Sequence, residues 1–423
     1  MEKKVIVCFG PGPMFKGGIA NYNTSLAKAF DKIEDIEVHI VSWTQQYPAI
    51  IPRDFIDRKS KTDLLEGTDI KVHYITNYNN PASWSGTVKL IKGLNPDKVI
   101  FQWAIAIQGI PLGHIAKKLR KQKNIEVIFD LHFVIQKEGS SLDNRLTKHA
   151  IKHADSYVVH AFKTADELKT LFPQKKFEVI ERNGPVSNTG ILVRKLYHPV
   201  YDMFAPDKDF NKEKQKQEWG LNKHVFLFFG FIRKYKGLHN VVEAFAKLAN
   251  KRDDVSLMIV GEAFWNTLDK KKFSTKLKSA TFGLAKKIFL KKQDDEGDYN
   301  PLENIEKYGI QDKVYQLIDF VPNEDVNKYF QVSDNIMLFY LTATPSGIES
   351  IAYNFEMPML ATKVGHFTET IVDGFNGYLA EPENIDSMAE VMEKSITQPI
   401  KKANVAVTSK DMSWANYAKE ILR

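Results

Sequence analysis

The sequence predicts an α/β protein with two domains, each built on a mostly parallel β-sheet. Its 423 residues suit two domains of roughly 200 residues each. Short apolar runs of strand length alternate with segments of helical periodicity, a pattern typical of parallel sheets covered by helices. Apolar residues make up 43% of the chain, enough for two cores. We expect the domains to span residues 1–205 and 206–407.

The amino-terminal half begins with an apolar run, Lys4 to Phe9, that predicts a buried strand. A loop rich in glycine and proline, residues 10–18, leads into a helix at about 19–30. A dinucleotide site is the obvious alternative for such a loop, but GPGPMF has prolines where N–H donors are needed and lacks the third glycine. Later strands are expected at residues 38–43, 70–75, 98–103, 125–131 and 156–160.

The second half repeats this alternation after a segment without periodicity, residues 183–209, which we interpret as the interdomain linker. Strands are expected at residues 225–229, 255–260, 314–317, 335–339 and 359–362. Closing helices are expected at residues 381–394 and 414–422. The second domain is therefore also predicted to be a parallel sheet with helices on its faces.

A basic turn joins the first strand of the second domain to its helix. Arg233, Lys234, Lys236 and Gly237 lie between Phe229 and the helical pattern that follows. Open α/β sheets bind ligands at the carboxyl ends of their strands, so cations at this turn predict an anionic ligand. A solvated basic connection is the alternative for these residues alone.

A second turn of the same kind follows the strand that ends near Tyr340. It carries Thr344, Ser346 and Gly347 and leads into a helical segment that runs to about Phe355. The N-terminus of a helix binds phosphate through its unpaired N–H groups and its dipole. Together the two turns predict a two-sided site for a diphosphate.

These motifs resemble the retaining family-4 glycosyltransferases of the GT-B fold, within the glycosyl transferases group 1. The resemblance rests on FGFIRKYKGL, LMIVGE, the SG pair at 346–347, PMLATKVG and DGFNGYLAEP. It implies two Rossmann-like, doubly wound domains that face each other across a cleft. The first domain would be the acceptor side, joined by a C-terminal helix at about 408–423, and the second would bind the nucleotide sugar.

The resemblance also implies roles for particular residues. Arg233 and Lys236 would stabilise the leaving diphosphate, and His132, which directly follows the strand IEVIFDL, would face the transferred sugar. A structural role for His132 is the alternative. The donor would be bound by residues of the GGI loop and of the second turn, namely Gly17, Gly18, Ser346, Gly347 and Ile348.

Two acidic positions of the family pattern are not acidic in this chain. Counting back from Pro358, they hold Ala343 and Ile351. Glu349 lies two helical positions from Ile351, about 200° around the helix, and so cannot simply substitute for the missing acid. The donor stays open between uridine and guanosine diphosphate sugars, and His366, where the family more often has glycine, is left without a role.

Charge and cysteine content restrict the partners. The net charge of +7 and a pI near 9.0 favour anionic ligands, and nine lysines without an acid lie between Lys270 and Lys292, where apolar residues recur at helical spacing. We expect this segment to contact an anionic membrane surface, with a solvated helix as the alternative. A single cysteine, Cys8, and no long apolar run favour a cytoplasmic protein, soluble or peripheral on the inner face of the plasma membrane.

The expected activity is the transfer of a sugar from a nucleotide diphosphate donor to a glycan or lipid-linked acceptor, with no metal or other cofactor and no nucleic acid partner. Assembly of cell-surface polysaccharide or glycolipid would use such a reaction. A non-catalytic module that binds anionic polymers or lipid head groups is the alternative of a different class. Salt-dependent binding without nucleotide selectivity would distinguish that module. A sugar-nucleotide phosphorylase is the alternative among enzymes.

Overall fold

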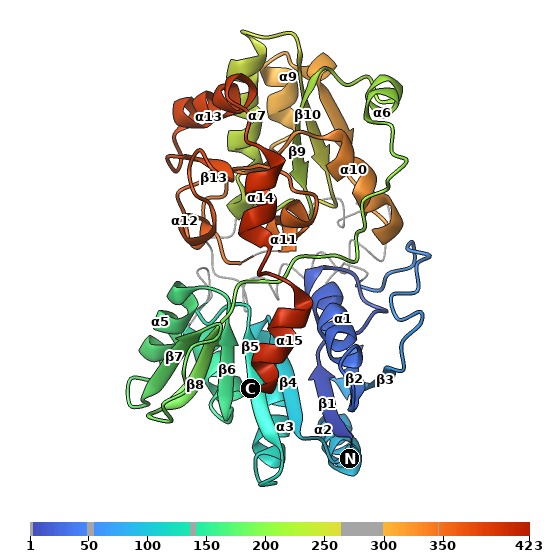
Figure 1. Ribbon diagram of the computed structural model, residues 1–423, viewed down its shortest axis with the longest axis vertical. Helices are drawn as coiled ribbons and strands as arrows, with labels where there is room; N and C mark the ends of the chain where they lie inside the picture. The colour runs from blue at the N-terminus through green and yellow to red at the C-terminus, as the bar shows by residue number, and fades with distance from the viewer. Residues whose placement is uncertain (1–2, 49–54, 136–140, 264–298, 346) are drawn as a thin grey trace.

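The computed structural model describes residues 3–48, 55–135, 141–263, 299–345 and 347–423. Two parallel sheets with helices on their faces form two lobes, one above the other in Figure 1. The fold class predicted from the sequence is therefore confirmed: the chain is α/β, with two Rossmann-like doubly wound domains.

The sheet of the amino-terminal domain has eight strands, in the order β3-β2-β1-β4-β5-β6-β8-β7. Neighbouring strands of this sheet pair in parallel. The strands are β1 (Lys4–Phe9), β2 (Ile36–Gln45), β3 (Lys71–Asn77), β4 (Lys98–Trp103), β5 (Glu126–Leu131), β6 (Ser156–Val159), β7 (Phe177–Glu181) and β8 (Ile191–Lys195). The helices are α1 (Gly18–Asp31), α2 (Pro81–Leu94), α3 (Gly109–Leu119), α4 (Ser141–Ile151) and α5 (Phe162–Leu171).

The sheet of the carboxyl-terminal domain has six parallel strands, in the order β11-β10-β9-β12-β13-β14. They are β9 (His224–Phe229), β10 (Val255–Val260), β11 (Val314–Leu317), β12 (Asn335–Leu338), β13 (Met359–Thr362) and β14 (Gly377–Ala380). Its helices are α6 (Lys212–Glu218), α7 (Leu238–Ala249), α9 (Glu303–Lys307), α10 (Val326–Val332), α11 (Gly347–Asn354), α12 (Phe367–Thr370), α13 (Ile385–Thr397) and α14 (Lys402–Ser409). None of the helices in the described part of the chain has the length and apolarity to cross a bilayer.

The strand order determines where two of the predicted ligand-binding segments lie. In each sheet the first strand lies between the second and the fourth, so the chain turns in opposite directions on its two sides. A crevice opens beyond the carboxyl ends of the strands at such a point. The loop after β1 and the basic turn after β9 both start there, and these are the segments that the sequence marks as ligand-binding.

The linker predicted at residues 183–209 is partly wrong, because it contains a strand. β8 (Ile191–Lys195) pairs with both β6 and β7. Two of its residues, Arg194 and Lys195, are buried although they are charged. These cations hide the apolar pattern by which a buried strand is recognised, and the strand forms because partners on both sides bond its backbone.

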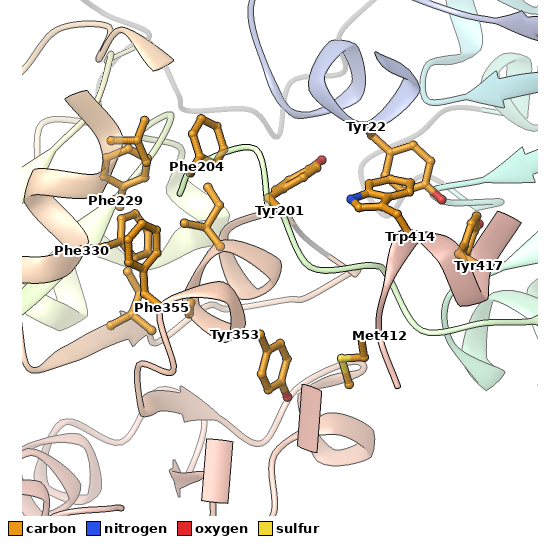
Figure 2. Close-up of a cluster of buried hydrophobic side chains, with 14 of the residues drawn as sticks. Tyr22, Tyr201, Phe204, Phe229, Phe330, Tyr353, Phe355, Met412, Trp414 and Tyr417 are labelled. Atoms are coloured by element: carbon orange, nitrogen blue, oxygen red, sulfur yellow. The ribbon is translucent and has the colours of Figure 1, made fainter. Parts of the chain in front are cut away.

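The last helix, α15 (Trp414–Leu422), returns to the amino-terminal domain and lies beside α1 in Figure 1. Its Tyr417 hydroxyl donates to Asp130 Oδ2 over 3.1 Å, and the Trp414 ring packs edge-on against Tyr22. Figure 2 shows these rings at one end of a cluster that continues through Tyr201 into the carboxyl-terminal domain. One hydrophobic core therefore includes residues from both domains.

Candidate functional site

A cavity of about 330 Å³ lies between the two domains. Its walls come from the loop before α1, from the chain near Tyr201, and from the turns after β9 and β12. Five of the eight residues singled out from the sequence line it, and they come from three separate loops: Gly17, Gly18, Lys236, Gly347 and Ile348. Ser346 lies outside the described residues.

Lys236 supplies a buried cation to this cavity. Its side chain is only 6% exposed, and its ammonium lies 5.9 Å from the centre of the Tyr340 ring. Burial, together with the positive charge of Arg233, lowers the pKa of Lys236 to about 7. Within the described ranges no carboxylate lies at ion-pair distance from it. A cation held in this way favours an anionic ligand, which would compensate for its lost hydration.

The turn that holds Lys236 depends on glycine. Gly237 has a φ of +66°, and a Cβ at this position would lie 2.1 Å from the carbonyl oxygen of Phe339. Only glycine therefore fits between the end of the turn and the start of α7. Arg233 begins the turn in an extended conformation and is half-buried beside Lys236. It acts on Lys236 electrostatically but does not itself line the cavity.

Another part of the cavity wall is the start of α11. Gly347 opens this helix, and Ile348 follows it along the cavity wall. The first N–H groups of a helix have no partner inside the helix and carry its positive dipole end. The start of α11 and Lys236 thus line the same cavity from two strand-to-helix turns.

The glycine loop of the amino-terminal domain closes a third side. Gly17 has φ +101° and ψ 170°, which is open to glycine alone, and Gly18 begins α1. A Cβ on Gly17 would meet nothing within 4 Å, so a ligand has free access to this backbone. The two glycines are positioned to approach a ligand closely.

Tyr201 is a lining residue that the sequence analysis missed. Its hydroxyl donates to the carbonyl oxygen of Gly18 over 2.8 Å, and a Cβ on Gly347 would lie 2.6 Å from its ring. The side chain is 2% exposed. Tyr201 therefore joins the glycine loop of one domain to the start of α11 in the other. The segment YHPVYDMF around it gives no pattern that would reveal this contact.

His132 lies apart from this cavity. It follows β5 and is 8% exposed, and its Nε2 is 2.8 Å from Gln102 Oε1. Burial lowers the pKa of His132 to about 4; the charge of Asp130 opposes this effect and that of His160 adds to it. The imidazole is therefore neutral near pH 7. It packs among Tyr22, His160 and other rings and is not among the residues that line the 330 Å³ cavity.

Asp130 is the centre of the buried polar network beside His132. Its Oδ1 is 2.9 Å from His160 Nε2, and its Oδ2 accepts hydrogen bonds from Tyr22 and Tyr417. Burial alone would raise the pKa of Asp130, but the interactions with His160 and His132 and the Tyr22 hydroxyl outweigh it and lower the pKa. The network links β5, β6, α1 and α15.

Asp130, His132 and His160 are close enough to hold a metal ion, with ligand atoms within 4.8 Å of one another. Each of the three nevertheless has a hydrogen-bonding partner in the protein. These contacts account for the burial of the three side chains, so we assign the cluster to the hydrogen-bonded network.

Glu349 and His366, which the sequence left without a role, form a buried pair. Glu349 Oε2 is hydrogen-bonded to His366 Nε2, and the side chains are 5% and 2% exposed. The pair lines a second, much smaller cavity on the other side of α11 from the large one. Ala343 and Ile351, at the two acidic positions of the family pattern, are buried and apolar.

Hydrogen bonds cross the cleft at the edge of the large cavity. Glu324 of the carboxyl-terminal domain accepts from the Lys61 backbone over 3.0 Å and from the Thr62 hydroxyl over 3.4 Å. The backbone of Asn323, which lines the cavity, donates to Ser60 Oγ over 3.0 Å. These contacts fasten a loop of the first domain over one end of the cavity.

Comparisons with known proteins show which proteins this chain is similar to. A curated relative, the lipopolysaccharide 1,2-N-acetylglucosaminetransferase of Salmonella typhimurium, is 26% identical over 201 residues; the match covers 46% of this chain and 46% of that protein. The chain thus matches under half of the length of this relative.

Solved structures share the fold at low sequence identity. HepE of Anabaena in complex with UDP has a TM-score of 0.65 and 15% identity, over 99% of this chain and 98% of its own. A glycosyltransferase of Rickettsia africae has a TM-score of 0.65 and 16% identity, over 100% and 97%. The family model "Glycosyl transferases group 1" matches residues 209–420, about half of the chain, including the turns with Lys236 and Gly347. The chain therefore belongs to the glycosyl transferases group 1 family and has its GT-B fold.

Proposed function

We propose that this protein is a retaining glycosyltransferase that moves a sugar from a nucleotide diphosphate donor to a glycan or lipid-linked acceptor. The observation that carries the proposal is that the buried Lys236 ammonium and the start of α11 line the same cavity of about 330 Å³. A diphosphate matches both walls, since it is anionic and accepts hydrogen bonds.

The same arrangement supplies a mechanism. Negative charge grows on the diphosphate as its bond to the anomeric carbon breaks. Lys236, with Arg233 beside it, stabilises that charge more strongly in the transition state than in the ground state, which is what lowers the barrier. Lys236 in the cavity, the charge of Arg233 beside it and the dipole of α11 can offset the charge of the leaving group, so we propose a reaction without a metal ion.

The donor and the stereochemistry rest on similarity. The HepE structures are named as complexes with UDP and UDP-glucose, and the Salmonella relative is named for the transfer of N-acetylglucosamine. These names favour a UDP-linked hexose or N-acetylhexosamine, with GDP-linked sugars as the second choice. Retention of the anomeric configuration follows from the motifs shared with family-4 enzymes.

The acceptor and the place of action are part of the proposal. The Salmonella relative is named for its action on lipopolysaccharide, which supports a role in the assembly of a cell-surface polysaccharide or glycolipid. We place the reaction in the cytoplasm, at the inner face of the plasma membrane. The lysine-rich segment from Lys270 to Lys292, which lies outside the described residues, would provide the membrane contact.

The test is incubation with UDP-glucose, UDP-galactose, UDP-N-acetylglucosamine and GDP-mannose, with and without inorganic phosphate. We expect release of the nucleotide diphosphate from one donor class without a requirement for phosphate, and an α-linked product from an α-linked donor by NMR. Replacing both Arg233 and Lys236 by alanine should lower turnover by on the order of 10² or more. Normal turnover in that variant would rule out the role of the two cations.

A further inference from the structure

We propose that Glu349 and His366 form a subsite that binds a single hydroxyl group of a sugar substrate. This inference rests on the proposed glycosyltransferase activity and adds a residue pair that determines specificity. Its starting point is the small cavity that Glu349, His366, His198 and Ser350 line on one side of α11.

The pair has unused hydrogen-bonding capacity at a buried position. Glu349 Oε2 and His366 Nε2 are bonded to each other. Glu349 Oε1 and His366 Nδ1 are both buried, and neither has a hydrogen-bond partner among the described residues. Orphaned polar atoms of this kind are rare in folded proteins, since each lost hydrogen bond is costly. Two of them on one bonded pair indicate that a ligand or a water completes the site.

The size of the cavity limits what can bind. Its volume is about 10 Å³, roughly the space of one water-sized group. A hydroxyl fits this space, whereas a phosphate or a whole sugar ring does not. A hydroxyl also has the right chemistry, because its O–H can donate to the carboxylate of Glu349 while its oxygen accepts another hydrogen bond.

The location of the cavity connects it with the reaction. Gly347, Ile348 and Ile351 of α11 face the large cavity, while Glu349 and Ser350 of the same helix face the small one. Pro345 lines both. The two cavities therefore adjoin at the turn before α11, where a sugar attached to a diphosphate or an acceptor beside it would lie.

Four other polar side chains around the small cavity already have partners. Ser350 Oγ is 2.7 Å from His198 Nδ1, and His160 Nε2 is bonded to Asp130. The Thr370 hydroxyl donates to the carbonyl of His366 over 3.4 Å. The unmet capacity is thus concentrated on Glu349 and His366, and this is why we assign recognition to them.

The hydroxyl can come from the donor sugar or from the acceptor, and the experiment separates the two. The wild type, Glu349→Gln and a control, Thr370→Val, are compared. The control changes the lining of the same cavity but leaves the Glu349–His366 pair intact. The donor arm measures hydrolysis of the accepted nucleotide sugar and its monodeoxy analogues without acceptor. The acceptor arm measures transfer to methyl hexosides and their monodeoxy derivatives.

We expect that removing one particular hydroxyl lowers wild-type kcat/KM by about tenfold or more, the effect of losing a hydrogen bond to a charged group. In Glu349→Gln the same deletion should cost less than about threefold, while other deletions keep their wild-type effect. Thr370→Val should retain the wild-type pattern. If Glu349→Gln removes the effect of the hydroxyl deletion on hydrolysis of the nucleotide sugar, the hydroxyl belongs to the donor. If it removes the effect only on transfer to the acceptor, the hydroxyl belongs to the acceptor.

The proposal would be overturned if removing each hydroxyl lowered kcat/KM by the same factor in Glu349→Gln as in the wild type, in both arms. The Glu349–His366 pair would then be a structural contact. Calorimetric titration with UDP and GDP distinguishes failure of the subsite proposal from failure of the proposed function. If the wild type binds neither nucleotide, the proposed function itself is contradicted. If Glu349→Gln does not fold, Glu349→Leu combined with His366→Leu takes its place, since that variant leaves no orphaned charge.

Discussion

The hydroxyl of Tyr201 donates to the carbonyl oxygen of Gly18, with 2.8 Å between the two oxygens, while its ring lies directly against Gly347. One side chain of the connecting segment thus touches both glycine-containing walls of the cavity. The Tyr201 ring leaves no room for a side chain at position 347. A substitution of Gly347 therefore tests whether this contact between the domains matters.

Gly347→Ala should disturb the site. The new Cβ would lie 2.6 Å from the Tyr201 ring, so either the ring or α11 must move. Overpacking of this kind typically costs about 1–3 kcal/mol. We expect a lower melting temperature and at least a tenfold loss of turnover. Gly93→Ala is the matched control, because a Cβ there meets nothing within 4 Å; equal behaviour of the two variants would contradict the contact.

Binding of UDP should weaken as pH rises above 7. The pKa of Lys236 is lowered to about 7, so the free protein loses this proton above that pH. A bound diphosphate favours the ammonium, so binding must take up a proton there, and affinity should fall by up to about tenfold per pH unit between pH 7 and 9. Calorimetric titration measures this slope.

Lys236→Met provides the control, since it should bind UDP weakly and with little pH dependence in this window. The same shift predicts the stability of the ligand-free protein. The folded state holds this proton more weakly than the unfolded chain, whose lysine titrates at its ordinary value, so the Lys236 contribution to stability should rise as pH increases from 7 towards 10.5. A steep UDP slope in Lys236→Met would assign the titration to another group.

His132→Ala should lower sugar transfer at least tenfold while UDP affinity stays within about twofold. The side chain lies outside the cavity that would hold the diphosphate, so its loss should not reach the nucleotide. Tyr417→Phe is the comparison, because it removes a hydrogen bond to Asp130 from the same network, worth about 1.5–3 kcal/mol. It should lower the melting temperature without a selective loss of transfer. If His132→Ala shows the same profile, His132 is structural.

Glu324→Ala should weaken nucleotide binding by about threefold to tenfold. It removes the acceptor of the hydrogen bonds from Lys61 and Thr62 that fasten the two domains at the edge of the cavity. Asp325→Ala is the control, since the ion pair that Asp325 forms in the described part of the chain is with Lys328 of its own segment. Small-angle scattering with and without UDP tests whether closure of the cleft is affected. If Glu324→Ala binds UDP with unchanged affinity and scatters like the wild type, the hydrogen bonds across the cleft do not contribute to nucleotide binding.

The protein should float with anionic liposomes at low salt and weakly with neutral ones. Each lysine near an anionic bilayer contributes about 1 kcal/mol, and nine lie between Lys270 and Lys292. Deleting this segment should abolish flotation and spare UDP binding. If flotation persists after the deletion, the membrane contact lies on another surface of the protein. If the intact protein does not float at all, a soluble acceptor is favoured.

The sequence by itself determined much of the fold. Five strands, at residues 4–9, 98–103, 255–260, 314–317 and 359–362, have the bounds predicted for them. The helix at 414–422 does as well. Except for the partly buried edge strand β11, these segments carry a continuous apolar run or a clear helical period, and burial on both faces requires that pattern wherever the partners come from. The turn with Lys236 was predictable for a related reason, because a glycine and several cations at the end of a buried strand have a local signature.

What only the tertiary structure decided depends on contacts between distant segments. β8 was hidden because Arg194 and Lys195 are buried in it, and its neighbours β6 and β7 determine its conformation. Tyr201 has a role only because Gly18 and Gly347 meet it from opposite sides. Glu349 and His366 are 17 residues apart, and their pairing depends on how α11 packs against the loop after β13. Such relations have no local period, because the free energy that fixes them comes from packing between elements and not from the propensity of any one segment.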